Sequence, residues 1–288
     1  MPALLRSARP NQWLKNVLVV AAPGAAGVLG DPTAIWRVTL AFAAFCLASS
    51  GTYFWNDVLD VESDRSHPSK SGRPIAAGLV GLRTARLVGT GLLAAGLLTA
   101  AGTGRWQLVT AVAAYEVVTL SYSTIWKHIA VIDLVAIASG FVLRAAGGAW
   151  AVGVEMSSWF LLVTTFGALF VVAGKRYAEA RQLGDGAGAV RATLGEYSEG
   201  FLRFVLSVTC GGALVSYCVW AFETRDLAGT ELPWYELSIV PIVAAFFRYA
   251  LVLDQGHGAA PEEVFRNDRV LQVLGLVWAA LFAVAVYS

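Results

Sequence analysis

Long apolar runs alternate with short polar stretches along the whole chain. Each run approaches the ~20 residues that a helix needs to cross the ~30 Å hydrocarbon layer of a membrane. Backbone groups in lipid must pair within their own segment, so the runs predict helices rather than open strands. The pattern predicts nine spans, at roughly residues 14–30, 34–54, 82–101, 106–121, 129–152, 157–174, 201–221, 234–253 and 270–287.

The composition agrees with a membrane protein. Hydrophobic residues make up 57% of the chain and charged residues only 14%, whereas soluble domains carry about 25% charged residues. Such a shortage of charge excludes a disordered chain, a coiled coil and a nucleic-acid-binding domain. The 29 glycines permit close helix packing, within the chain or in a homo-oligomer. We therefore predict an all-α, polytopic membrane protein, with residues 1–288 forming one domain.

The basic residues predict which side of the membrane each loop faces. Most Lys and Arg residues lie on the face that holds the N-terminus and the two long polar loops, near 55–81 and 175–200. Cytoplasmic loops carry an excess of Lys and Arg. We therefore expect this face, and any chemistry on it, to be cytoplasmic in a plasma-membrane protein.

An acidic motif follows the second span, where residues 56–64 read NDVLDVESD. The spacing i, i+3, i+7 predicts that Asp57, Asp60 and Asp64 share one helix face, with Asn56 beside them. Like charges at such spacing destabilise a helix, so a cation should compensate. Oxygen ligands suit Mg²⁺, especially where a substrate phosphate completes its shell. The competing interpretation is a solvated helix end paired with nearby basic residues, among them Arg65, Lys70 and Arg73.

The motif and the loop after it resemble a known family. Residues 64–78 read DRSHPSKSGRPIAAG, and with NDxxDxxxD they resemble the first aspartate-rich motif and loop of UbiA-type membrane prenyltransferases. The resemblance extends over essentially the whole chain. It implies nine helices around a cytosol-facing cavity, with Asp57, Asp60 and Asp64 as catalytic residues and Mg²⁺ ligands.

One segment departs from the typical prenyltransferase. A second aspartate-rich motif is expected after the sixth span, but residues 174–181 read GKRYAEAR. Arg can bind a phosphate through its planar fork and Lys as a point charge. We therefore predict that Lys175, Arg176 and Glu179 contribute to substrate binding. The alternative is a plain surface pair between Lys175 and Glu179, four residues apart.

The combination of NDxxDxxxD with GKRYAE resembles one branch of the superfamily, the decaprenyl-phosphate phosphoribosyltransferases. Residues 9–16 (RPNQWLKN) and 142–145 (VLRA) agree with this branch. The resemblance implies transfer of 5-phosphoribose from phosphoribosyl pyrophosphate (PRPP) to decaprenyl or another polyprenyl phosphate, with release of diphosphate, for arabinan and arabinogalactan cell-wall precursors. Isoprenoid transfer to a small or aromatic acceptor is the alternative. A transporter would instead string ionisable residues across the midplane.

Five further basic residues are candidate ligands for the substrate phosphates: Lys15, Lys70, Arg73, Lys127 and Arg144. Arg144 is the most informative, because an Arg near a helix centre costs at least ~2.5–3.5 kcal/mol and should face a polar cavity. The alternative for Arg144 is a structural pair with Asp133 or Glu116. We expect Asp133 to orient Lys127 or a ribose hydroxyl. Tyr197 is interpreted as a helix-end anchor or a loop pairing, and a functional role is the alternative.

Overall fold

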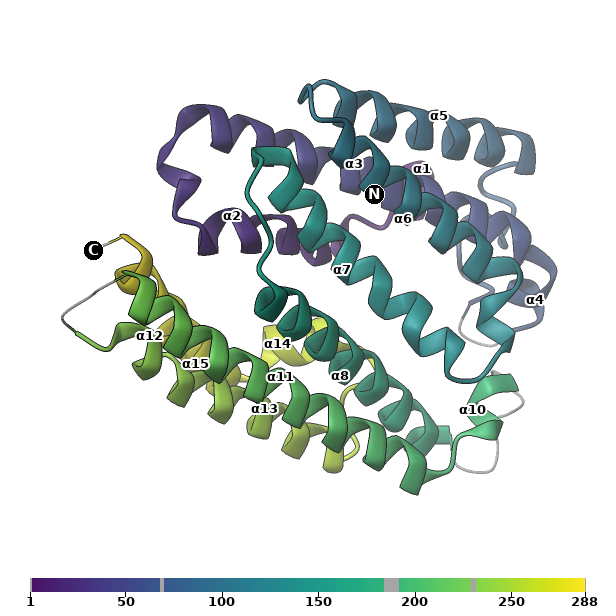
Figure 1. The fold of residues 1–288 in the computed structure, drawn as a ribbon. Helices are drawn as coiled ribbons and strands as arrows, with labels where there is room; N and C mark the ends of the chain where they lie inside the picture. The colour runs from purple at the N-terminus through teal and green to yellow at the C-terminus, as the bar shows by residue number, and fades with distance from the viewer. Residues whose placement is uncertain (1, 68–69, 184–191, 229–231, 288) are drawn as a thin grey trace. The chain divides into compact units, whose positions relative to one another are not determined.

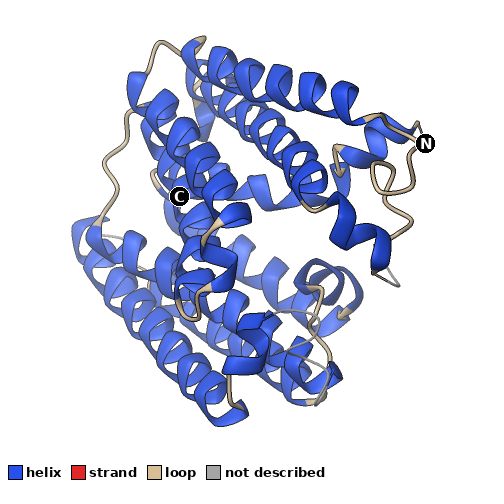
Figure 2. Cartoon of the chain, turned by 90° about the vertical axis from the view of Figure 1, so that its right-hand side faces the viewer, coloured by secondary structure: helices blue, strands red, loops and turns tan. Residues whose placement is uncertain are grey.

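The structure, a computed structural model, describes residues 2–67, 70–183, 192–228 and 232–287. Every regular element in these ranges is a helix, as Figure 2 shows, which confirms the predicted all-α class. The chain divides into two compact units, residues 1–127 with 139–155 and residues 128–138 with 156–288. Of the two predicted long loops, residues 68–69 and 184–191 lie outside the described ranges.

The helices follow one another along the chain as labelled in Figure 1. The first unit contains α1 (Ala3–Ser7), η1 (Pro10–Val20), α2 (Ala21–Ala25), η2 (Val28–Gly30), α3 (Pro32–Leu59), α4 (Val61–Ser66), α5 (Leu82–Ala101), α6 (Trp106–Thr124) and most of α7 (Ile132–Val152). The short η3 (Trp126–His128) follows α6. The second unit contains the start of α7, then α8 (Ser158–Leu183), α10 (Ala192–Glu196), α11 (Glu199–Ala228), α12 (Trp234–Leu237), α13 (Ile239–Asp254), α14 (Pro261–Asn267) and α15 (Arg269–Tyr287).

Seven stretches of helix in the described residues are long and apolar enough to cross a membrane, and they coincide with seven of the nine predicted runs. The run at 106–121 lies in the 19-residue helix α6. The run at 14–30 is divided into η1, α2 and η2. Pro23 has no N–H to offer the carbonyl of Val19, and Gly27 has the left-handed φ of 68°. The prediction of one long helix at 14–30 is therefore wrong.

Small residues bring α3 and α5 close together in the first unit. A Cβ added to Gly51 would lie 2.9 Å from the carbonyl oxygen of Gly89, and one added to Gly96 would lie 3.1 Å from that of Ala44. Glycine at these positions lets the two backbones approach, as expected for helices that pack in a bilayer. The resulting pair holds the acidic end of α3 on a rigid support.

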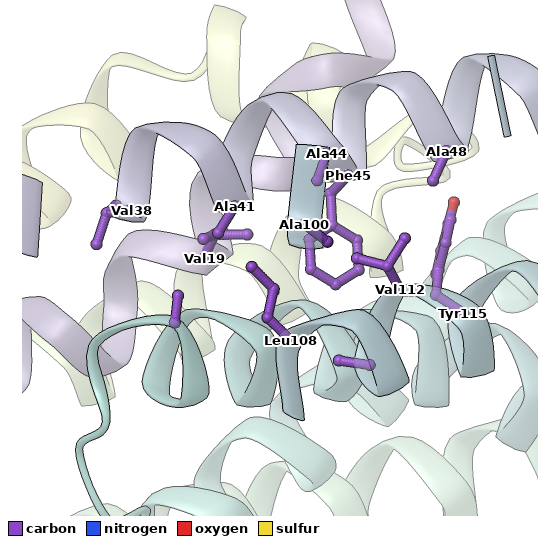
Figure 3. Close-up of a cluster of buried hydrophobic side chains, with 12 residues drawn as sticks. Val19, Val38, Ala41, Ala44, Phe45, Ala48, Ala100, Leu108, Val112 and Tyr115 are labelled. Carbon is purple, nitrogen blue, oxygen red and sulfur yellow. The ribbon is translucent and has the colours of Figure 1, made fainter. Parts of the chain in front are cut away.

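A buried apolar cluster forms the core of the first unit (Figure 3). It joins α3, α6 and the N-terminal segment through side chains that include Val19, Phe45, Leu108 and Val112. The ring of Tyr115 meets that of Phe45 edge-on, with 5.6 Å between centroids. Tyr115 thereby has its ring in the core while its hydroxyl remains available for a polar partner.

The second unit is built on long helices that pack side by side, α8 with α11 and α13 with α15. At the α8–α11 contact, a Cβ on Gly212 would lie 2.8 Å from the ring of Phe166. Near α14, the rings of Tyr249 and Phe265 stack with 5.4 Å between centroids. Tyr249 also lies against α8 directly before the predicted phosphate ligands, where a Cβ on Gly174 would lie 3.4 Å from its ring.

Candidate active site

The acidic motif lies at the junction of α3 and α4. Helix α3 ends at Leu59, and α4 begins at Val61 after a non-helical Asp60. The hydrogen bond from Asp64 N to Asp60 O, at 2.8 Å, continues the helical i, i+4 pattern across this junction. Asp57 and Asp64 are both buried, and Asp60 is partly exposed. The predicted continuous helix is thus interrupted, but the carboxylates of Asp57 and Asp64 remain close enough to contact the same nitrogen of Arg73.

Basic side chains from distant parts of the sequence neutralise these carboxylates. Arg73 Nη1 lies 3.3 Å from Asp57 Oδ1 and 2.6 Å from Asp64 Oδ2. Arg9 Nη2 lies 2.5 Å from the same Asp57 oxygen. Lys127 Nζ lies 2.7 Å from Asp60 Oδ1. Arg73 thus pairs with the motif as the competing interpretation predicts, and Lys127 pairs with it too. The roles of Arg73 and Lys127 in binding substrate phosphates stay predictions.

Arg9 is a member of this cluster that the sequence reasoning did not single out. Its backbone has a left-handed φ of 51°, which is uncommon for a residue other than glycine. Its guanidinium also lies over the ring of Tyr53, 4.7 Å from the centroid. The local signals at Arg9 are its position directly before Pro10 and its place at the start of RPNQWLKN, residues 9–16.

The remaining predicted ligands of the first unit have varied surroundings. Asn56 accepts a hydrogen bond from Ser123 of α6, which connects the acidic motif to that helix. Lys15 lies in η1 and Lys70 in the loop after α4, and both have interaction partners. The roles of Lys15, Asn56 and Lys70 in substrate binding stay predictions.

Arg144 is buried in α7, only 6% exposed. Its Nε donates to Asn16 Oδ1 at 2.6 Å and its Nη2 to the Tyr115 hydroxyl at 2.9 Å. Its Nη1 donates to the carbonyl of Gly140 at 2.8 Å. The partners of Arg144 are therefore neutral acceptors. The alternative of a structural pair with the carboxylate of Asp133 or Glu116 is wrong. Arg144 joins η1, α6 and α7, so its predicted contact with substrate stays a prediction beside this structural role.

We expect Arg144→Lys to lower the free energy of unfolding by about 2 kcal/mol. A lysine keeps the charge, but its single ammonium cannot serve acceptors on three segments as the planar guanidinium does. Thermal unfolding in detergent measures the change. Arg86→Lys is the control, because Arg86 is exposed on α5. Equal stability of the two variants would contradict a structural role for Arg144.

In the second unit, Lys175, Arg176 and Glu179 lie on α8. Lys175 Nζ lies 3.7 Å from Glu179 Oε1, as the surface-pair alternative predicts. Arg176 is only 1% exposed, and it pairs with Asp133 at 3.1 Å and with Glu179 at 2.8 Å. Lys175 is therefore the more accessible cation of the two. A phosphate-binding role for these three residues stays a prediction.

The donor set of the acidic motif fits a Mg²⁺ ion. Within the described residues, no three carboxylate, imidazole or thiol groups form a ready-made metal cage. Mg²⁺ seldom uses such a cage, because it is usually held by one or two carboxylates together with substrate phosphates and water. Here one positively charged nitrogen of Arg73 already contacts both buried carboxylates, Asp57 and Asp64. The motif thus provides carboxylate oxygens that could bind Mg²⁺, at a position where Asp57 and Asp64 already stabilise the positive charge of Arg73.

A sequence profile described as the UbiA prenyltransferase family matches residues 17–278. The chain belongs to the UbiA prenyltransferase family. Among its relatives is the decaprenyl-phosphate phosphoribosyltransferase of Corynebacterium glutamicum, 42% identical over 99% of this chain and 86% of the relative. The protein of the same name from Mycobacterium tuberculosis is 40% identical over 98% of this chain and 94% of the relative.

Solved structures confirm the UbiA fold. A UbiA homologue from Archaeoglobus fulgidus, bound to DMAPP and Mg²⁺, matches with a TM-score of 0.76 and 19% identity over 99% of this chain and 97% of the other. A structure of digeranylgeranylglyceryl phosphate synthase matches with a TM-score of 0.69 and 16% identity over 99% of this chain and 97% of the other. These likenesses establish the architecture of this UbiA-family chain.

Proposed function

We propose that this chain transfers 5-phosphoribose from PRPP to decaprenyl phosphate and releases diphosphate, supplying lipid-linked precursors for cell-wall arabinan. The observation that carries the proposal is the identity of 40–42% to proteins named decaprenyl-phosphate phosphoribosyltransferase, over nearly the full length of the chain. The segment GKRYAE at 174–179 agrees with this choice, because isoprenoid transfer by the typical prenyltransferase uses a second aspartate-rich motif there.

Asp57, Asp60 and Asp64 are the proposed Mg²⁺ ligands. When bound there, Mg²⁺ would offset the negative charge that develops on the departing diphosphate. The Mg²⁺ in the A. fulgidus structure of the same fold supports a divalent metal in this family. The burial of Asp57 and Asp64 strengthens their electrostatic interactions, since water screens them less.

The basic side chains around the motif are the proposed ligands of the PRPP phosphates. Arg9, Arg73 and Lys127 neutralise carboxylates in this structure, and the same donors suit phosphate oxygens. Arginine provides the paired N–H groups that match phosphate geometry. Lys15 and Lys70 are the further candidates in this unit. The anionic substrate would thus be surrounded by a basic set of side chains.

The reaction needs no general base from the protein. A phosphate monoester has its second pKa near ~6, so the lipid nucleophile is already largely ionised at neutral pH. The ribosyl carbon becomes oxocarbenium-like as its bond to diphosphate breaks, as in glycoside hydrolysis. Attack opposite the leaving group inverts the anomeric centre. The protein's role is to bind and orient the two substrates and to offset the charge on the departing diphosphate. Its carboxylates and basic side chains suit this role.

The membrane placement follows the distribution of charge. We propose that this chain is a multi-pass protein of the plasma membrane, with its N-terminus and acidic motif on the cytoplasmic side. The excess of basic residues beside that motif supports this orientation. It also gives the site access to PRPP, which is water-soluble. Association into a homo-oligomer through glycine-rich helix faces remains part of the proposal.

Radiolabelled PRPP tests the proposed function. Purified protein in detergent is incubated with PRPP labelled in the ribose, MgCl₂ and decaprenyl phosphate, and the organic phase is counted. We expect label in the organic phase only when both the lipid phosphate and Mg²⁺ are present. Activity with EDTA would contradict the metal assignment. Transfer of an isoprenoid to an aromatic acceptor, with no lipid-linked ribose phosphate, would favour the alternative prenyltransferase.

A further inference from the structure

Arg176 is held in a fixed position inside the second unit. Its Nε donates to Asp133 Oδ2 at 3.1 Å, and its Nη1 donates to Glu179 Oε2 at 2.8 Å. Asp133 is itself fully buried and accepts a further hydrogen bond from the Tyr197 hydroxyl. Two carboxylates thus already compensate the single charge of a guanidinium that is almost fully buried. Arg176 is therefore suited to orienting Glu179 rather than to binding a substrate phosphate itself.

Glu179 has one carboxylate oxygen fixed and the other available. Oε2 accepts the hydrogen bond from Arg176. Oε1 lies 3.7 Å from Lys175 Nζ, which is longer than a hydrogen bond, and it accepts no hydrogen bond from the residues that the structure describes. The side chain is 21% exposed, so a ligand can approach it. Oε1 is thus an oriented hydrogen-bond acceptor on the surface of α8.

The charges around Oε1 favour a neutral donor as its ligand. The carboxylate repels a phosphate oxygen, and the adjacent Lys175 and Arg176 repel a metal ion. A hydroxyl group donates a hydrogen bond without adding charge, and a bond to a carboxylate is stronger than one between neutral groups. Decaprenyl phosphate offers only a phosphate and hydrocarbon. PRPP, in contrast, carries two hydroxyl groups on neighbouring carbons of its ribose ring.

We infer that Glu179 binds the ribose hydroxyls of PRPP and selects ribose over deoxyribose, with Arg176 as its positioning residue. The inference rests on the proposed function, because it takes PRPP as the substrate. Lys175 lies one helical turn from Glu179 and is 41% exposed. Its ammonium remains available for a phosphate group of the same molecule. One turn of α8 thus provides an acceptor for the sugar and a donor for a phosphate.

Analogues of PRPP that lack the 2-hydroxyl or the 3-hydroxyl test this assignment. In the wild type, we expect kcat/KM for PRPP to exceed that for at least one analogue by about ten- to a hundredfold, the usual effect of a hydrogen bond to a charged group. In Glu179→Gln, Arg176 retains the amide oxygen, and an NH₂ group that cannot accept takes the place of Oε1. The kcat/KM for PRPP should then fall to that of the analogue, which should hardly change.

Glu199→Gln is the matched control. Glu199 pairs with Arg203 at 2.8 Å, four residues along α11, as Glu179 pairs with a basic residue on α8. Its side chain is exposed, and the preference for PRPP should remain as in the wild type. An unchanged preference in Glu179→Gln would overturn the proposal. A loss of activity that is equal for PRPP and both analogues would also overturn it, and would indicate a metal or phosphate ligand instead.

Arg176→Lys tests the positioning role. A lysine keeps the charge beside the buried Asp133, but a single ammonium cannot hold both carboxylates as the planar guanidinium does. The preference for PRPP should fall, with little further loss in a Glu179→Gln background. Thermal unfolding in detergent checks that each variant is folded. Additive losses of preference would show that Arg176 does not act through Glu179.

A binding measurement separates this inference from the proposed function. Ribose 5-phosphate should raise the unfolding temperature of the wild type more than at least one of its 2-deoxy and 3-deoxy counterparts does at equal concentration. This difference should disappear in Glu179→Gln and persist in Glu199→Gln. Wild-type protein that makes no lipid-linked ribose phosphate would refute the proposed function, and the temperature shifts would still decide whether Glu179 recognises ribose.

Discussion

Asp60→Asn should lower the kcat for ribosyl transfer by at least about a hundredfold, the usual effect of removing one preorganised electrostatic group. Asparagine has nearly the same shape, but it lacks the negative charge that Mg²⁺ binding requires. The lost ion pair with Lys127 is partly exposed on both sides, and such pairs contribute at most about 1 kcal/mol. The variant should therefore remain folded. Initial rates at saturating PRPP and Mg²⁺ measure the effect.

Glu62→Gln provides the matched control for this prediction. Glu62 lies on α4, two residues after Asp60, and forms an exposed pair with Arg65 at 2.8 Å. It carries the same charge within the same motif but is largely exposed and pairs with Arg65. We expect its activity to stay within about twofold of wild type, since exposed pairs contribute little. Full activity in Asp60→Asn, or equal loss in Glu62→Gln, would show that the metal assignment is wrong.

Local patterns in the sequence were sufficient to predict much of the architecture. The thickness of the membrane sets a minimum length for a spanning helix, and seven of the predicted runs reappear as helices long enough to span. The acidic residues also stay close despite the break at Asp60, because the hydrogen bond from Asp64 N to Asp60 O continues the helical spacing across it. Arg73 lies in the loop that follows them, and its contact with Asp57 and Asp64 is the pairing that the competing interpretation of the motif predicts.

Contacts between distant segments were not predictable in this way. Arg9 reaches Asp57 only because the backbone adopts a left-handed φ before Pro10, and periodicity does not report such conformations. Asp133 was expected to orient Lys127 or a ribose hydroxyl. Lys127 pairs with Asp60, whereas Asp133 binds Arg176 and Tyr197. These partners lie 43 and 64 residues away. Their pairing depends on how the helices pack, which one sequence does not specify.

Gly148→Ala is expected to lower the free energy of unfolding by about 3 kcal/mol, at the upper end of the cost of overpacking. A Cβ at Gly148 would lie 1.8 Å from the carbonyl oxygen of Val19. Both groups belong to backbone, so no flexible side chain can move aside. Either α7 or the N-terminal segment must shift by more than an ångström. Thermal unfolding in detergent, followed by circular dichroism, measures the loss.

Gly91→Ala separates this steric effect from the general preference of helices for alanine. Gly91 also lies in a spanning helix, α5, but a Cβ there would meet nothing within 4 Å. Alanine is favoured over glycine in a helix by up to about 1 kcal/mol, so Gly91→Ala should be neutral or stabilising. The shift caused by Gly148→Ala should also reach the acidic motif, because Arg9 and Val19 belong to the same N-terminal segment. Its activity should therefore fall even below its unfolding temperature, and an active, stable Gly148→Ala protein would show that this segment does not pack against α7.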